Sequence, residues 1–154
     1  NGVVTSGSDI AVIKIVGKAP SWAIPRMILD EHQAVASGDR LLLSGYGVVN
    51  EVSNPIQDAI GLNQVYVQVA KTFGNIIVTD QTNAQGACMG DSGGPAYLET
   101  SKGLVVVGAT RGPHAGAPDC RHFGEYTAVK GYKSFILEKA QEWGAQLPTF
   151  TTRY

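Results

Sequence analysis

The residues best suited to chemistry in this sequence lie in one short stretch, Gly86–Tyr97, with the letters GACMGDSGGPAY. Ser92 stands in the middle of it, after Asp91 and before two glycines. A serine in this setting is a candidate nucleophile for acyl transfer. A neutral serine hydroxyl is a poor nucleophile, so this chemistry requires a base that takes its proton.

Two further interpretations use the same residues. Gly, Asp and Ser are common turn formers, which allows a glycine-rich turn without chemistry, although the long ordered string disfavours it. The pattern Gly-x-Ser-x-Gly around Ser92 also satisfies a nucleophile elbow, and Asp119 and His122 follow in the order that an elbow enzyme requires. An elbow needs a buried strand before the serine and a helix after it. Residues 79–89 are polar and turn-like and Pro95 begins an extended segment, so the surroundings argue against an elbow.

Composition and charge narrow the class of protein. The chain has 154 residues, 44% hydrophobic and 16% charged, which is typical of one globular domain with a core. The net charge of −1 and the lack of a basic run argue against nucleic acid and acidic membrane surfaces as partners. The strongly apolar runs, such as Leu104–Val107, are too short to span a membrane. No signal peptide is visible, and because the chain begins at Asn1 without Met, we expect a processed or trimmed product.

Short apolar runs between turn residues predict an all-β protein. The predicted strands cover residues 10–16, 41–48, 63–70, 76–79, 95–98, 104–110 and 122–128. One helix is predicted at about 131–143, where apolar residues recur at helical spacing and Gly144 follows as a stop. Together they indicate a barrel with a C-terminal helix. If the strands within 41–128 close a six-stranded barrel, strand 10–16 has no partner in the chain and favours self-association.

The chain has two cysteines, Cys88 and Cys120, and three scattered histidines, His32, His114 and His122. No Cys-x-x-Cys pair is present, so the pattern predicts no metal site, and we expect no cofactor. From their number alone, one disulfide and two free thiols are equally open.

Over nearly its whole length the sequence resembles the chymotrypsin/trypsin-like serine proteases. Five segments resemble the family's catalytic-Asp segment, its Ser-Gly-Trp-Gly strand, its nucleophile segment, its Gly-Val-Tyr-Thr strand and its final helix, in that order. These segments are Ser8–Ile15, Leu43–Gly47, Cys88–Pro95, Gly124–Thr127 and the helix at 131–143.

The resemblance implies the second six-stranded antiparallel Greek-key barrel of a double-barrel fold, followed by the C-terminal helix. Residues 1–20 would be the last strand of an otherwise missing first barrel, and residues 21–40 the connection between barrels. Residues 41–130 would form the second barrel with the nucleophile, and residues 131–154 the helix and tail.

The resemblance also assigns roles in a serine endopeptidase that works through an acyl-enzyme. Ser92 would be the nucleophile, and the N–H groups of Gly90 and Ser92 would form the oxyanion hole. Asp9 would orient the imidazole of a catalytic histidine. Asp91 would pair with an N-terminal amine released by activation cleavage. The chain begins with Asn1-Gly2 rather than Ile-Val, so Asp91 is expected to lack this partner.

The family's catalytic histidine precedes the Asp, and no histidine precedes Asp9. We therefore expect this chain to be inactive without a His-bearing segment, supplied by another piece of a nicked enzyme. The alternative is an inactive homologue or fragment that acts as a binding module. The expected partners are a protein or peptide substrate and either the missing barrel or a second copy joined through strand 10–16.

The resemblance places a substrate pocket around Gly86, Ala87, Thr110, Arg111, Gly112 and Gly124. Gly86 stands at the pocket base, where trypsin-type enzymes have Asp, so Lys and Arg are disfavoured at the cleavage site. Glycines at the walls are expected to leave the pocket open to a neutral, apolar side chain.

Two neighbours of this pocket carry separate expectations. Strand alternation points Glu125 away from the pocket. The Thr110 hydroxyl would lie near Asp9 and Arg111 would be a surface charge, although a one-residue shift would bring Arg111 next to Asp9.

The same resemblance pairs Cys88 with Cys120 in a disulfide beside the pocket. The disulfide and the family together imply a secreted protein, extracellular or periplasmic.

Overall fold

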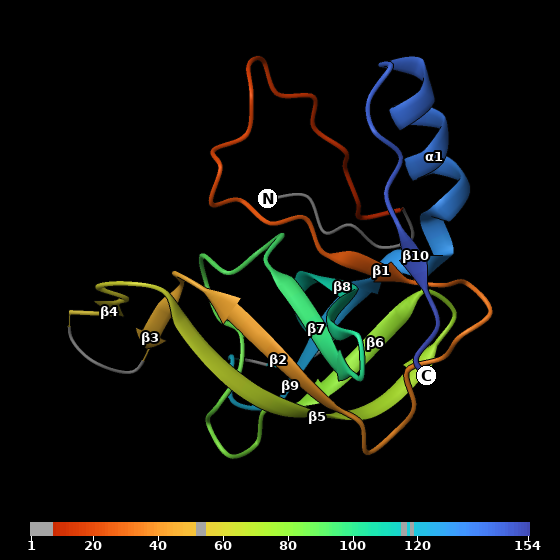
Figure 1. The fold of residues 1–154 in the computed structure, drawn as a ribbon. Helices are drawn as coiled ribbons and strands as arrows, with labels where there is room; N and C mark the ends of the chain where they lie inside the picture. The colour runs from red at the N-terminus through yellow and green to blue at the C-terminus, as the bar shows by residue number, and fades with distance from the viewer. Residues whose placement is uncertain (1–7, 52–54, 115–116, 118) are drawn as a thin grey trace.

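Six antiparallel strands form a closed barrel in the computed structural model, which describes residues 8–51, 55–114, 117 and 119–154 (Figure 1). The strand order is β8-β7-β2-β5-β6-β9, and β9 pairs back onto β8. The bounds are β2 Arg40–Gly45, β5 Asn63–Phe73, β6 Ile76–Asp80, β7 Pro95–Thr100, β8 Gly103–Pro113 and β9 Phe123–Ala128. The predicted six-stranded antiparallel barrel is confirmed.

The barrel closes because one face of each strand is apolar. In β5, Val67 and Val69 are buried, whereas Tyr66 between them is 37% exposed, as the alternation predicts. Leu41 and Leu43 of β2 meet them in the same core, together with Tyr126 of β9. Leu41 and Tyr126 are fully buried. This core is the rigid base from which the loops between strands project.

In the part of the chain that the structure describes, four short strands lie outside the barrel. β1 (Met27–Leu29) runs parallel to both β8 and β10 (Phe150–Thr151). β3 (Val48–Asn50) and β4 (Gln57–Asp58) form a separate two-stranded sheet among the described residues. The sequence predicted none of the three pairings, because strands of two or three residues carry no periodic pattern.

The predicted C-terminal helix is present as α1 (Lys133–Glu142), preceded by a 3-10 turn, η1 (Val129–Tyr132). Gly144 follows with φ +61°, a left-handed conformation suited to glycine at a helix end. In the described part of the chain, no helix is long and apolar enough to cross a membrane.

The predicted strand at 10–16 is not formed. Residues 8–16 have no strand partner and lie in the long loop that rises above the barrel in Figure 1. Ile13 is 80% exposed and Val16 is fully exposed. The physical reason is that a strand needs a neighbour: the barrel is closed, and β1 already takes the free stretch of β8. Residues 10–16 are apolar as a strand would be, but among the described residues they have no neighbouring strand to pair with.

Candidate active site

Ser92 lies at an exposed turn in the loop between β6 and β7, directly after the half-buried Asp91. One carboxylate oxygen of Asp91 accepts a hydrogen bond from the Gly47 N–H at 2.8 Å, and the other accepts one from the Cys88 N–H at 3.0 Å. The Gly94 N–H donates to the Asp91 carbonyl at 2.9 Å. Charge-assisted bonds of this kind are stronger than neutral ones, so Asp91 sets the shape of the loop.

Glycines leave the room that this carboxylate occupies. A Cβ at Gly45 or at Gly47 would overlap the Asp91 side chain. Gly90 has φ +91°, and a Cβ there would lie 3.1 Å from the Gly47 Cα. Gly45 and Gly47 at the end of β2 and Gly90 before Ser92 therefore have the same effect. Without a Cβ, they let the Ser92 loop pack directly against the end of β2.

The N–H groups of Gly90 and Ser92 have no protein acceptor among the described residues. The N–H of Gly93 is by contrast used, since it donates to the Thr110 carbonyl at 2.8 Å. Gly90 and Ser92 are both exposed. Two free donors beside a serine hydroxyl are the arrangement that an oxyanion requires.

Asp9 lies beside Arg111, with the guanidinium Nε 3.7 Å from a carboxylate oxygen of Asp9. Arg111 also contacts Glu125 at 3.2 Å, and its side chain is only 20% exposed. The interpretation of Arg111 as a surface charge is therefore wrong, and the one-residue shift describes its position. The Thr110 hydroxyl donates to the Gly94 carbonyl at 3.1 Å, and among the described residues no hydrogen bond joins it to Asp9. Arg111 takes the place beside Asp9 because β8 has an irregular register between Thr110 and Gly112.

No contact among the described residues joins Ser92 to a histidine. Each histidine instead has its own carboxylate: His32 with Glu31 at 3.8 Å, His114 with Glu125 at 2.6 Å, and His122 with Asp119 at 2.8 Å. The backbone N–H of Arg121 and the His122 ring hold the pKa of Asp119 below its usual range. The described part of the chain thus holds a candidate nucleophile without a base next to it.

Cys88 and Cys120 form a disulfide, as the resemblance implies, with Cα atoms 5.3 Å apart. Glu51 supports it from the side, because its carboxylate accepts the Cys120 N–H at 3.1 Å. The Arg121 guanidinium lies 3.8 Å from the same carboxylate. The disulfide and Glu51 together tie the Ser92 loop to the loop before β9.

The side chain of Gln81, for which the sequence predicts no role, fills the space between Gly86 and Gly124. A Cβ at either glycine would overlap the side-chain amide of Gln81, which is 1% exposed. Gln81 therefore occupies the volume toward which a side chain at either glycine would point, while Gly86 and Ala87 also line the cavity beside Asp91 described below. Glu125 meets Arg111 and His114, whereas the neighbouring Gly124 faces Gln81, as strand alternation predicts.

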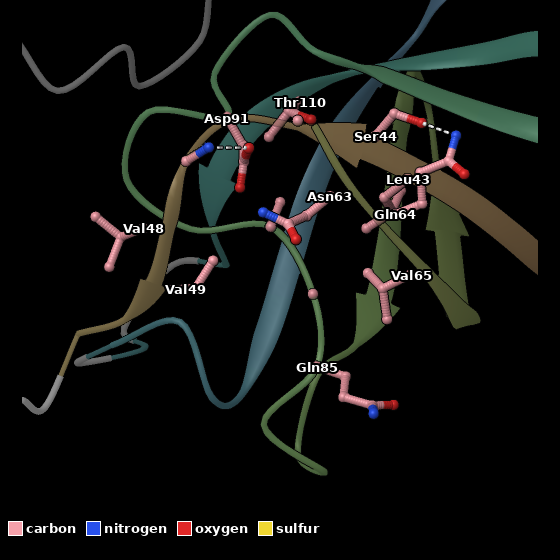
Figure 2. A pocket seen from close by; sticks show the side chains of 14 residues that line it. Leu43, Ser44, Val48, Val49, Asn63, Gln64, Val65, Gln85, Asp91 and Thr110 are labelled. Atoms are coloured by element: carbon pink, nitrogen blue, oxygen red, sulfur yellow. Dashed lines mark hydrogen bonds between the residues drawn. The ribbon is translucent and has the colours of Figure 1, made fainter. Parts of the chain in front are cut away.

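A cavity of about 210 Å³ lies beside Asp91, between β2, β5 and the loop that carries Gly86 (Figure 2). Leu43, Val48 and Val65 supply apolar walls, and the Asp91 carboxylate stands at one end. A second hollow of about 460 Å³ opens next to Ser92 and is lined by Tyr46, Leu62 and Tyr97, among other residues. The Ser92 loop therefore has space on both sides.

A comparison with family models matches residues 2–136 to the trypsin model. The chain belongs to the trypsin family. Brachyurin of Leptuca pugilator is 41% identical over 124 residues, which cover 73% of this chain and 54% of brachyurin. Serine protease SP24D of Anopheles gambiae is 30% identical over 99 residues, covering 59% of this chain and 36% of that protein.

Solved structures agree on the fold of this trypsin-family chain. A mutant of human heparin binding protein (CAP37) superposes with a TM-score of 0.64 at 20% identity, covering 84% of this chain and 54% of that one. The chain thus spans about half the length of brachyurin and of the heparin binding protein, and about a third of SP24D.

Loss of the disulfide has a predictable effect on stability. Replacing both cysteines, Cys88→Ser with Cys120→Ser, opens a loop with a sequence separation of 32. The freed unfolded chain gains entropy, so we expect the free energy of unfolding to fall by about 3–4 kcal/mol. Urea unfolding followed by circular dichroism measures this, with reduced wild type as the matched control. An unchanged midpoint in both samples would contradict the prediction.

Proposed function

We propose that this trypsin-family chain carries the nucleophile of a serine endopeptidase that cleaves peptide bonds through an acyl-enzyme. The observation that carries the proposal is the exposed Ser92 hydroxyl beside two N–H groups, on Gly90 and Ser92, that have no acceptor among the described residues. Donors fixed in this way stabilise negative charge that appears only in the transition state.

In the proposed reaction the Ser92 oxygen attacks the substrate carbonyl carbon while a histidine imidazole takes the hydroxyl proton. The carbonyl oxygen becomes an oxyanion and accepts the N–H groups of Gly90 and Ser92. The imidazolium then gives its proton to the leaving amine, the peptide bond breaks, and water releases the acyl group by the same steps. Asp9 would orient the imidazole, and the Arg111 guanidinium, 3.7 Å from the Asp9 carboxylate, would help to hold that carboxylate in place.

The histidine would come from a segment that the described residues do not contain. The relatives named above are longer than the matched region, which supports a His-bearing barrel as the partner. The exposed apolar side chains of Ile13, Val16 and Trp22 are consistent with a surface that such a barrel covers. Self-association through residues 10–16 is the other arrangement that would cover them.

The cavity beside Asp91 fits the activation step that the family resemblance implies. A new N-terminus would place its apolar side chain between Leu43 and Val65 and its α-amino group near the Asp91 carboxylate. Asn1 lies outside the described residues. Secretion is part of the same proposal, because a disulfide persists in oxidising compartments.

An inactive homologue that binds without cleaving is the second candidate. The observation that favours it is that His32, His114 and His122 each contact a carboxylate, while among the described residues no contact joins a histidine to Ser92. The residue at the catalytic-histidine position of the partner segment discriminates the two functions.

Intact mass spectrometry of the purified protein, combined with a fluorophosphonate probe, tests the proposal. We expect a second polypeptide with a histidine segment and one probe molecule attached to Ser92. A single species of this chain that the probe leaves unlabelled would contradict the nicked-enzyme proposal and favour the binding module.

A further inference from the structure

We propose that the Gln81 side-chain amide forms the floor of the substrate pocket and makes the pocket shallow and uncharged, so that it selects small neutral side chains such as Ala and Val. The proposal deepens the proposed function and rests on it. Gln81 follows β6 in a polar stretch that the sequence alone marks only as a loop.

The position of the amide comes from two glycines on different elements. An ideal Cβ built on Gly86 points at the Gln81 side-chain amide, and so does one built on Gly124. The resemblance assigns Gly86 to the pocket base and Gly124 to a wall. Gln81 therefore occupies the volume that these glycines would otherwise leave to the far end of a substrate side chain.

The amide is held in place by hydrogen bonds to both walls. Its nitrogen donates to the Ala87 carbonyl at 3.0 Å and to the Cys120 carbonyl at 2.8 Å. Its oxygen accepts the Ala87 N–H at 3.2 Å, and the Thr79 hydroxyl lies 3.5 Å from it. The Gln81 backbone is fixed too, since its N–H donates to the His122 carbonyl at 2.8 Å. A side chain that is 1% exposed and bonded on both sides cannot swing away cheaply when a substrate arrives.

The same bonds determine what the floor can recognise. Both amide protons and the amide oxygen are already used, so the floor offers neither a charge nor a free donor or acceptor. A Lys or Arg side chain would lose its hydration there without gaining a partner, which disfavours both. A Phe or Tyr ring would need the volume that the amide fills. A short neutral side chain meets neither obstacle.

Gln81→Ala tests the proposal by opening the floor while adding no charge. In the complete enzyme, we expect the ratio of kcat/KM for substrates with Phe over substrates with Ala at the cleavage site to rise at least tenfold, since a single methylene in a pocket is worth about that much. Gln81→Asn keeps the amide but shortens the side chain by one methylene. The preferred side chain at the cleavage site should then move from Ala toward Leu. Gln141→Ala on the exposed face of α1 is the matched control and should leave both ratios unchanged.

A binding measurement separates this proposal from the proposed function. Indole is titrated into the isotope-labelled chain while the N–H resonances of Gly86 and Gly124 are followed by NMR. We expect saturable shifts at both glycines in Gln81→Ala and none in wild type. If the complete protein is inactive but indole gives this result, endopeptidase activity is wrong and the floor assignment stands. Active variants with unchanged substrate ratios, or indole shifts equal to those of wild type, would overturn the floor assignment alone. If Gln81→Ala does not fold, Gln81→Asn decides by the same two readouts.

Discussion

Replacing Ser92 with alanine is expected to lower kcat/KM of the complete enzyme for a peptide amide with Ala at the cleavage site by on the order of 10⁶-fold. Alanine has no hydroxyl to form the acyl-enzyme, whereas the N–H groups of Gly90 and residue 92 remain in place. The loss should appear in kcat, with KM little changed, because Ser92 lies at an exposed turn and its side chain does not hold the loop together. A fluorogenic peptide assay measures both constants.

Ser134→Ala is the matched control for this substitution. Ser134 is an exposed serine on α1, distant in sequence from the nucleophile loop, and its loss should leave kcat and KM unchanged. Equal urea midpoints for both variants and wild type would show that folding is intact. Residual hydrolysis by Ser92→Ala within tenfold of wild type would mean that another group is the nucleophile.

The barrel could be predicted from the sequence because its strands are defined by local patterns. The alternation of Val67 and Val69 with Tyr66 places one face inward wherever the strand pairs. Residues 10–16 have the same apolar character, yet they form no strand, because pairing depends on a neighbour and not on the segment itself. For β1 and β10 the prediction misses in the opposite way. These two strands do pair, but they are too short for their sequences to show a strand pattern.

The site was predictable where a motif fixes the backbone and unpredictable where distant side chains meet. Gly90, Asp91 and Ser92 belong to one motif, so their loop followed from resemblance. Gln81 and Glu51 both form hydrogen bonds with the backbone of Cys120, at sequence separations of 39 and 69 residues. The local sequence around neither residue predicts such a distant bond. Arg111 shows the same limit, because its place beside Asp9 depends on an irregular register in β8.

Asp91→Asn is the second substitution with a large expected effect, because one carboxylate holds two N–H groups from separate segments. The Asp91 oxygens accept from Gly47 at 2.8 Å and from Cys88 at 3.0 Å. An asparagine amide has one oxygen, so either orientation turns its NH₂ group toward one of these donors. A half-buried donor left unsatisfied costs about 1–3 kcal/mol of folding free energy, which urea unfolding measures.

The catalytic consequence of Asp91→Asn should exceed the loss of stability. Displacing the Cys88 end of the loop turns the Gly90 N–H away from the oxyanion, and losing one such donor costs about 10²–10³-fold in kcat. KM should change little, since Ala87 and Cys120 beside the pocket remain tied by the Gln81 amide and by the disulfide. Asp58→Asn, at an exposed position on β4, is the matched control and should alter neither constant. A variant that loses stability but keeps its kcat would mean that Asp91 supports the fold without setting the oxyanion hole, because the two roles act on different observables.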